Sequence, residues 1–149
     1  MACGTARVAA SGSLACAILL AVSCGSSTAP TPAQITSVFT GTITPGGTSS
    51  QTFTVQYNGG ATDASIDVTS LVTVANNTPV SITIGTAFGD LQLGVCTPYI
   101  SNPATPLNTV ESTSGEPFTA GTYCVQIFDN TAAPTVTVPL TYMVTVTHY

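Results

Sequence analysis

After Arg7 the chain contains no lysine and no arginine, and this constrains its fold more than any other feature of the sequence. Only 5% of the 149 residues are charged, where an ordinary globular domain has roughly 25%. Neutral Thr, Ser, Asn and Gln must therefore supply the polar surface, and the β-branched Thr favours strands. Disordered chains contain few apolar residues, whereas 44% of the residues here are hydrophobic and can form a core. We therefore expect an ordered, all-β fold.

The same charge balance excludes two classes of partner. Beyond Arg7 the only charged side chains, leaving aside the imidazole of His148, are six carboxylates. Nucleic-acid binding and attraction to anionic lipids both depend on Lys and Arg. We therefore expect no nucleic-acid partner and no basic membrane-binding patch.

Residues 1–23 have the composition of a bacterial export signal. Arg7 is the only charged side chain in this segment, and residues 14–22 are almost entirely apolar. That apolar stretch is shorter than the roughly 20 residues that span a bilayer, and it has the length of a signal-peptide core. Ala21-Val22-Ser23-Cys24 resembles the lipobox of bacterial lipoproteins, although that family prefers Leu at the position of Ala21.

The lipoprotein resemblance implies an anchor and a location. Signal peptidase II would cut before Cys24 after that cysteine has received a diacylglyceryl group, and residues 24–35 would form a flexible linker. The domain would then comprise residues 36–149, at the cell envelope as an outer-membrane or cell-surface lipoprotein. The alternatives are ordinary cleavage at or shortly after Ala21, which would give a secreted protein, and an uncleaved anchor or a cytosolic protein.

The cysteine count agrees with this scheme. Cys3 and Cys16 would leave with the signal and Cys24 would carry the lipid, so that Cys96 and Cys124 remain as a pair. We expect these two to form a disulfide, because such bonds persist outside the cytoplasm. Two free thiols or two metal ligands are the alternatives.

Short segments of alternating polarity, separated by turn residues, predict a single antiparallel β-sandwich with almost no helix. A turn is expected at Gly89-Asp90, and a long proline-containing loop at residues 97–117. The expected strands cover residues 38–44, 51–57, 64–74, 80–86, 91–96, 122–129 and 140–148.

Three of these segments resemble the pre-peptidase C-terminal domains of bacteria. They are Phe53-Thr54-Val55, the strand at 121–129 that begins Gly-Thr-Tyr, and the closing Tyr142-Met143-Val144-Thr145-Val146. The resemblance covers about residues 36–149 and implies a jelly-roll-like sandwich of about seven to nine strands. It also implies an extracytoplasmic accessory or binding module, although no peptidase domain is present in this sequence.

Catalytic residues are scarce. The single histidine, His148, is expected to be a frayed residue near the end of the chain, and no lysine is available after Arg7 to activate a serine. We therefore expect no enzyme and no cofactor.

Binding residues are weakly indicated. Tyr99, in the expected long loop, is the best candidate for an exposed ligand-binding aromatic side chain. Asp63, Asp67 and Asp129 are weak candidates for calcium ligands, because turn formation is the favoured explanation for Asp63 and Asp129. The expected function is a non-catalytic binding or adhesion module with an unknown protein or glycan ligand. The alternatives are a structural or assembly subunit of an envelope complex and a secreted carbohydrate- or calcium-binding accessory domain.

Overall fold

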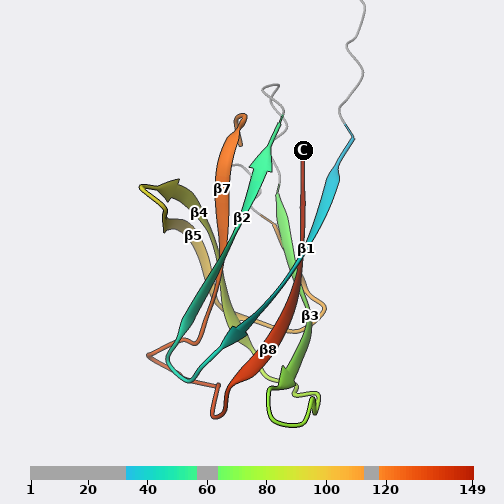
Figure 1. Ribbon diagram of the computed structural model, residues 1–149, viewed down its shortest axis with the longest axis vertical. Helices are drawn as coiled ribbons and strands as arrows, with labels where there is room; N and C mark the ends of the chain where they lie inside the picture. The colour runs from blue at the N-terminus through green and yellow to red at the C-terminus, as the bar shows by residue number, and fades with distance from the viewer. Residues whose placement is uncertain (1–32, 57–63, 113–117) are drawn as a thin grey trace, which may run out of the picture. The chain divides into compact units, whose positions relative to one another are not determined.

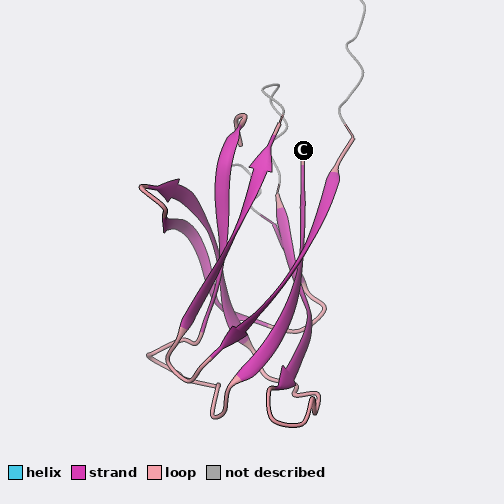
Figure 2. Cartoon of the chain, viewed as in Figure 1, coloured by secondary structure: helices cyan, strands magenta, loops and turns pink. Residues whose placement is uncertain are grey.

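The computed structural model describes residues 33–56, 64–112 and 118–149, and within these ranges it contains eight strands and no helix (Figure 2). The prediction of an all-β fold is confirmed. The strands are β1 (Ile35–Ile43), β2 (Thr48–Val55), β3 (Ser65–Thr73), β4 (Ile84–Gln92), β5 (Val95–Thr105), β6 (Val110–Ser112), β7 (Gly121–Phe128) and β8 (Leu140–His148).

The strands form two antiparallel sheets of four, which we call sheet A and sheet B (Figure 1). Sheet A has the order β1-β8-β3-β6 and sheet B the order β2-β7-β4-β5. First pairs with last, second with seventh, third with sixth and fourth with fifth, as if one long hairpin had been rolled up. This nesting is the jelly-roll topology, so the predicted architecture is confirmed as well.

The core lies between the two sheets, where alternate residues of each strand point inward. In β8 the inward residues Tyr142, Val144 and Val146 are fully buried, and their neighbours along the strand are threonines and Met143. The Tyr142 hydroxyl lies 2.8 Å from the Ser49 hydroxyl of β2, so a hydrogen bond joins the two sheets across the core. Polar and apolar residues alternate along β8 because one face of this strand is buried and the other is exposed.

The predicted long loop at residues 97–117 is wrong for most of its described part, because β5 and β6 occupy residues 97–105 and 110–112, and residues 113–117 lie outside the described residues. Prolines suggested the loop, and Pro98 and Pro103 both lie within β5. Proline is tolerated there because β5 is an edge strand, and two irregularities in its pairing with β4 fall near these residues. The disulfide therefore joins two strands and does not close the base of a free loop.

Two further boundaries differ from the prediction. Gly89-Asp90 is not a turn, because β4 continues to Gln92 and the hairpin turns at Leu93-Gly94. The strand predicted at residues 80–86 begins only at Ile84, although Val80 and Ile82 pack against the core.

The start of β1 and the end of β8 lie side by side, because Ile35 pairs with His148 (Figure 1). We call this end of the sandwich the terminal end. The turn of the β4–β5 hairpin lies there too, since Asp90 pairs with Tyr123 near the start of β7, and β7 starts opposite the end of β2. The link between β3 and β4 and the residues before β8 lie at the far end, where Thr73 pairs with Leu140.

Candidate functional site

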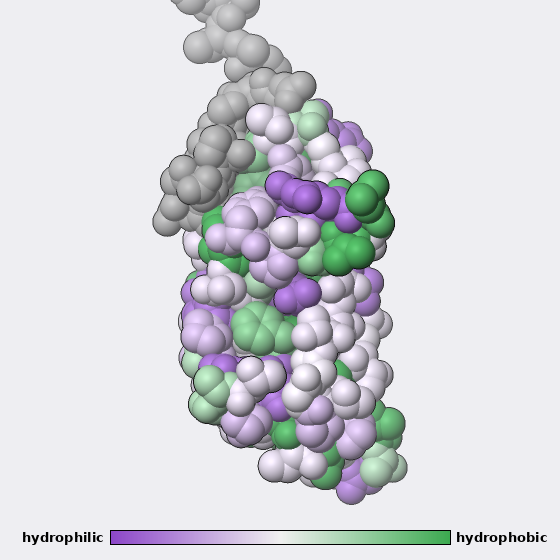
Figure 3. Space-filling model, turned by 90° about the vertical axis from the view of Figure 1, so that its left-hand side faces the viewer, coloured by the Kyte–Doolittle hydropathy of each residue, from purple (hydrophilic) through white to green (hydrophobic). Residues whose placement is uncertain are grey.

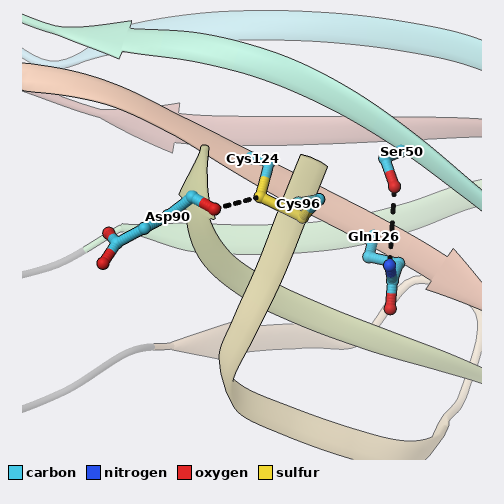
Figure 4. Close-up of a disulfide and its surroundings, with 5 residues drawn as sticks. All are labelled: Ser50, Asp90, Cys96, Cys124 and Gln126. Atoms are coloured by element: carbon cyan, nitrogen blue, oxygen red, sulfur yellow. Dashed lines mark hydrogen bonds between the residues drawn. A yellow bond between two sulfur atoms is a disulfide. The ribbon is translucent and has the colours of Figure 1, made fainter. Parts of the chain in front are cut away.

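The disulfide shows that the β4–β5 hairpin folds over the outer face of sheet B. Cys96 lies on β5 and Cys124 on β7, with β4 between these two strands. Strands separated by one neighbour lie roughly 9–10 Å apart in a flat sheet, yet the two Cα atoms here are 5.7 Å apart. Figure 4 shows the bond between β5 and β7. The hairpin must therefore curl out of the plane of the sheet to bring the cysteines together.

Gly89 makes this curl possible. It pairs with Cys124 on one side and with Pro98 on the other, at an irregularity in the β4–β5 pairing. A Cβ atom at this position would overlap the Thr97 carbonyl and lie 2.8 Å from the Pro98 Cα. Any side chain at residue 89 would therefore push β5 away from the sheet, and glycine here allows the close approach of two backbones.

The surroundings of the disulfide are polar. The Cys124 Sγ lies 3.5 Å from the Asp90 carbonyl oxygen, a packing contact, because a disulfide sulfur has no proton to donate. Along the same face Gln126 donates a hydrogen bond of 3.5 Å to the Ser50 hydroxyl of β2 (Figure 4). Sheet B thus carries neutral hydrogen-bonding groups next to the curled hairpin.

The curl creates a groove on the outer face of sheet B, with a volume of about 300 Å³. Ala87 and Phe128 form its floor, and Pro98 and Ser101 of β5 form one wall. Phe128 pairs with Gly85 across β7 and β4, and its ring covers that glycine, since a Cβ there would overlap the ring atoms. The remaining lining residues are Gly46, Thr48, Gln126, Asp129, Asn130 and Thr131.

The groove has little charge available for a ligand. Asp129 is its only ionisable lining residue, and it is 2% exposed. One carboxylate oxygen accepts the Gly46 N–H at 2.9 Å, and the other accepts those of Thr135 at 2.9 Å and Val136 at 3.3 Å. Burial raises the pKa of Asp129, but the three backbone N–H groups outweigh burial and hold the pKa below its ordinary value. Asp129 therefore fastens the loops at the end of the groove.

Two of the three calcium candidates, Asp67 and Asp129, are in or next to different sheets of the sandwich. Asp67 lies on β3 of sheet A, Asp129 follows β7 of sheet B, and Asp63 lies outside the described residues. The Asp67 Oδ1 atom is buried and has no hydrogen-bond partner. In residues 33–56, 64–112 and 118–149 no three His, Cys, Asp or Glu side chains are grouped to hold a metal ion.

Tyr99 lies on β5 and is 46% exposed. Its ring centroid is 6.4 Å from that of Phe118, which continues into a group of aromatic rings between the sheets. The groove lining does not include Tyr99. Exposure of Tyr99 agrees with the sequence analysis, and a role in ligand binding stays a prediction.

The expectation that His148 is frayed is wrong. His148 is the last residue of β8, is 3% exposed, and its ring lies 4.9 Å from the ring of Phe53. Its Nε2 atom lies 3.3 Å from the Ser37 hydroxyl of β1, the neighbouring strand. The pairing of β8 with β1 continues to the end of β8, and this pairing holds the imidazole in the core.

Sequence reasoning missed Phe128 and the groove. The available signal was the spacing of Gly85, Ala87 and Gly89, which places three small residues on one face of a strand. Small residues in such a row leave room for a covering group, here the Phe128 ring and the backbone of β5.

Cys24 and the predicted signal peptide lie outside the described residues. Within the part of the chain that the structure describes, no helix is long and apolar enough to cross a membrane. A scan of protein-family models finds no match to this chain. A search of curated proteins likewise finds no relative.

Proposed function

We propose that this protein is a non-catalytic binding module of the bacterial envelope that holds a neutral oligosaccharide in the groove on sheet B. The observation that carries the proposal is the composition of the groove, an aromatic ring on the floor surrounded by neutral amides and hydroxyls. A neutral sugar has an apolar C–H face that can lie on a ring and hydroxyls that can bond to amides. Gln126 and Asn130 supply such amides.

Charge narrows the class of ligand. The formal net charge is −5, and there is no Lys or Arg after Arg7 to bind an acidic group. An acidic polysaccharide or a phosphate would meet only carboxylates and dipoles, and repulsion would oppose binding. A neutral glycan avoids this repulsion and can use the hydrogen-bonding groups.

The proposal places the module outside the cytoplasm, attached through a lipid on Cys24. The Cys96–Cys124 disulfide supports this location, because such bonds persist in oxidising compartments. The intact mass of protein from the membrane fraction tests it. We expect the mass of residues 24–149 plus acyl chains, and an unlipidated mass with a free Cys24 thiol would contradict the anchor.

Binding is tested with an array of neutral and acidic glycans, followed by titration of the best ligand. Phe128→Ala is expected to weaken binding by at least about tenfold, because the stacking surface is lost. Tyr99→Ala is the matched control, an exposed aromatic side chain outside the groove, and it is expected to bind normally. Loss of binding in Tyr99→Ala alone would place the site elsewhere, and a preference for acidic glycans would contradict the proposal.

A further inference from the structure

The turn of the β4–β5 hairpin presents a strained and exposed leucine. Leu93 and Gly94 have φ angles of 51° and 80°, the left-handed values of a type I′ turn. Asn or Asp usually takes the first of these positions, and a branched residue such as leucine adopts it only with strain. Leu93 is 105% exposed and Val95 is 65% exposed. We call Leu93, Gly94 and Val95 the prong, and among the described residues Leu93 has no packing contact that would offset its strain.

An apolar hollow of about 450 Å³ lies elsewhere on the molecule. We call it the socket, and it is lined by Thr73, Val74, Ala75, Asn76, Val138 and Pro139. Val74 is 48% exposed and Val138 is 46% exposed, so that the apolar walls face solvent.

The walls of the socket are held in place. The Val74 N–H donates to the Pro139 carbonyl at 3.0 Å, which joins the two segments of the lining. The hydroxyl of Thr73 hydrogen-bonds the Asn76 side chain and also accepts the Thr78 N–H. The socket is therefore formed before anything enters it, which lowers the entropy lost on binding.

The prong and the socket lie at opposite ends of the sandwich. The prong is at the terminal end, beside the start of β7, and the socket adjoins the first residue of β8 at the far end. In Figure 3, which faces the side where the hairpin lies, hydrophobic side chains gather at the upper right of a mostly pale surface. A contact between two different patches at opposite ends is heterologous, and it adds copies in a row.

We infer that the prong of one copy of this chain inserts into the socket of another, forming head-to-tail rows. Copies of this chain cannot attract one another through Lys or Arg ion pairs, because none follow Arg7, so neutral polar and apolar groups must make any contact between them. The prong brings a leucine and a valine, and the lining of the socket contains no charged residue. This inference is independent of glycan binding in the groove.

The contact is small and the association is correspondingly weak. It buries far less than the roughly 1,200 Å² of a stable complex, and we expect a Kd on the order of 1 mM. Anchoring many copies on one surface would raise their effective concentration and extend the rows. Because copies with a net charge of −5 repel one another, added salt should strengthen the contact, the opposite of an ion-paired interface.

The test is NMR of the full-length chain carrying Cys24→Ser, in which no lipid can be attached. Backbone signals of residues 93–95 and 73–76 are expected to shift together as protein concentration rises, and at lower concentration in about 0.5 M than in about 0.05 M NaCl. Leu93→Asp and Val138→Asp should each abolish the shifts. Val38→Asp, which changes an exposed valine on β1, is the control and should keep them.

Mixing Leu93→Asp with Val138→Asp tests whether the prong of one copy enters the socket of another. Labelled Leu93→Asp has an intact socket, so unlabelled Val138→Asp should shift its signals at residues 73–76 and leave its prong signals unchanged. Reversing the labels should shift only the prong. No response in either mixture would overturn the inference. Prong signals that respond to phosphatidylcholine vesicles but not to protein concentration would overturn it in favour of lipid contact.

Discussion

The outer faces of both sheets are rich in neutral polar residues, and the groove lies on sheet B. On sheet A the two strands β1 and β8 present an open row of threonines, among them Thr40, Thr141 and Thr145. On sheet B the β4–β5 hairpin curls over the face and adds a wall above Phe128. Composition is therefore not what separates the two faces. The difference depends on Gly89 and on one disulfide.

Removing the disulfide should have the largest effect on the difference between the outer faces of sheets A and B. Cys96→Ala with Cys124→Ala releases a crosslink between residues 28 apart in sequence, and we expect about 3–4 kcal/mol less free energy of unfolding. Chemical denaturation of the double variant and the parent measures this loss.

Amide hydrogen exchange tests which strands the disulfide stabilises. Amides of β5 should exchange faster in the double variant, and glycan binding should fall because the wall of the groove is loose. Amides in the β1–β8 pair serve as the internal control. Their exchange should become faster only by the amount that the lower global stability of the protein requires. Equal local loosening of both sheets would show that the disulfide does not act on sheet B specifically.

Gly89→Ala should have the next largest effect, a loss of about 1–3 kcal/mol, because the added methyl group meets the backbone of β5. Gly85→Ala is the matched comparison on the same strand and face. The three atoms nearest its methyl group all belong to the ring of Phe128, a side chain that can rotate away, so we expect a smaller loss of stability. Thermal unfolding measures both variants. Equal losses would mean that the backbone contact at Gly89 is not special.

The smallest loss of stability should come from protonation of Asp129 at low pH. The pKa of Asp129 is lower in the folded chain than its ordinary value of 3.8, so its contribution is present above about pH 4 and is lost as the pH falls through the folded pKa. Asp129→Asn should remove this part of the acid sensitivity and reduce stability at neutral pH by about 1–2 kcal/mol. Urea unfolding at several pH values tests it, and an unchanged pH dependence in the variant would contradict the assignment.

Most of the fold could be predicted from sequence, because alternation and turn residues are local signals. The β8 alternation predicted both the strand and its buried face, and the cysteine count predicted the disulfide. Local signals could not predict that β5 is a strand. Pro98 and Pro103 favour a loop locally, and only the position of β5 at the edge of sheet B makes a strand possible there.

The groove was harder to predict because it depends on contacts between segments far apart in the chain. The sequence identifies Phe128 only as an apolar residue within an expected strand. Nothing local to it shows that Gly85 lies beneath its ring or that β5 passes beside it. His148 shows the same limit, since a residue close to the end of the chain is buried by its pairing with β1.

The position of β8 has a consequence for how this protein is made. Among the described strands β8 comes last along the chain, and it lies in the middle of sheet A between β1 and β3. Neither neighbour can complete its pairing until residues 140–148 have left the ribosome, so sheet A stays open until then. Assembly of sheet A therefore depends on a strand far from β1 in the sequence, and the two sheets cannot pack face to face before it is available.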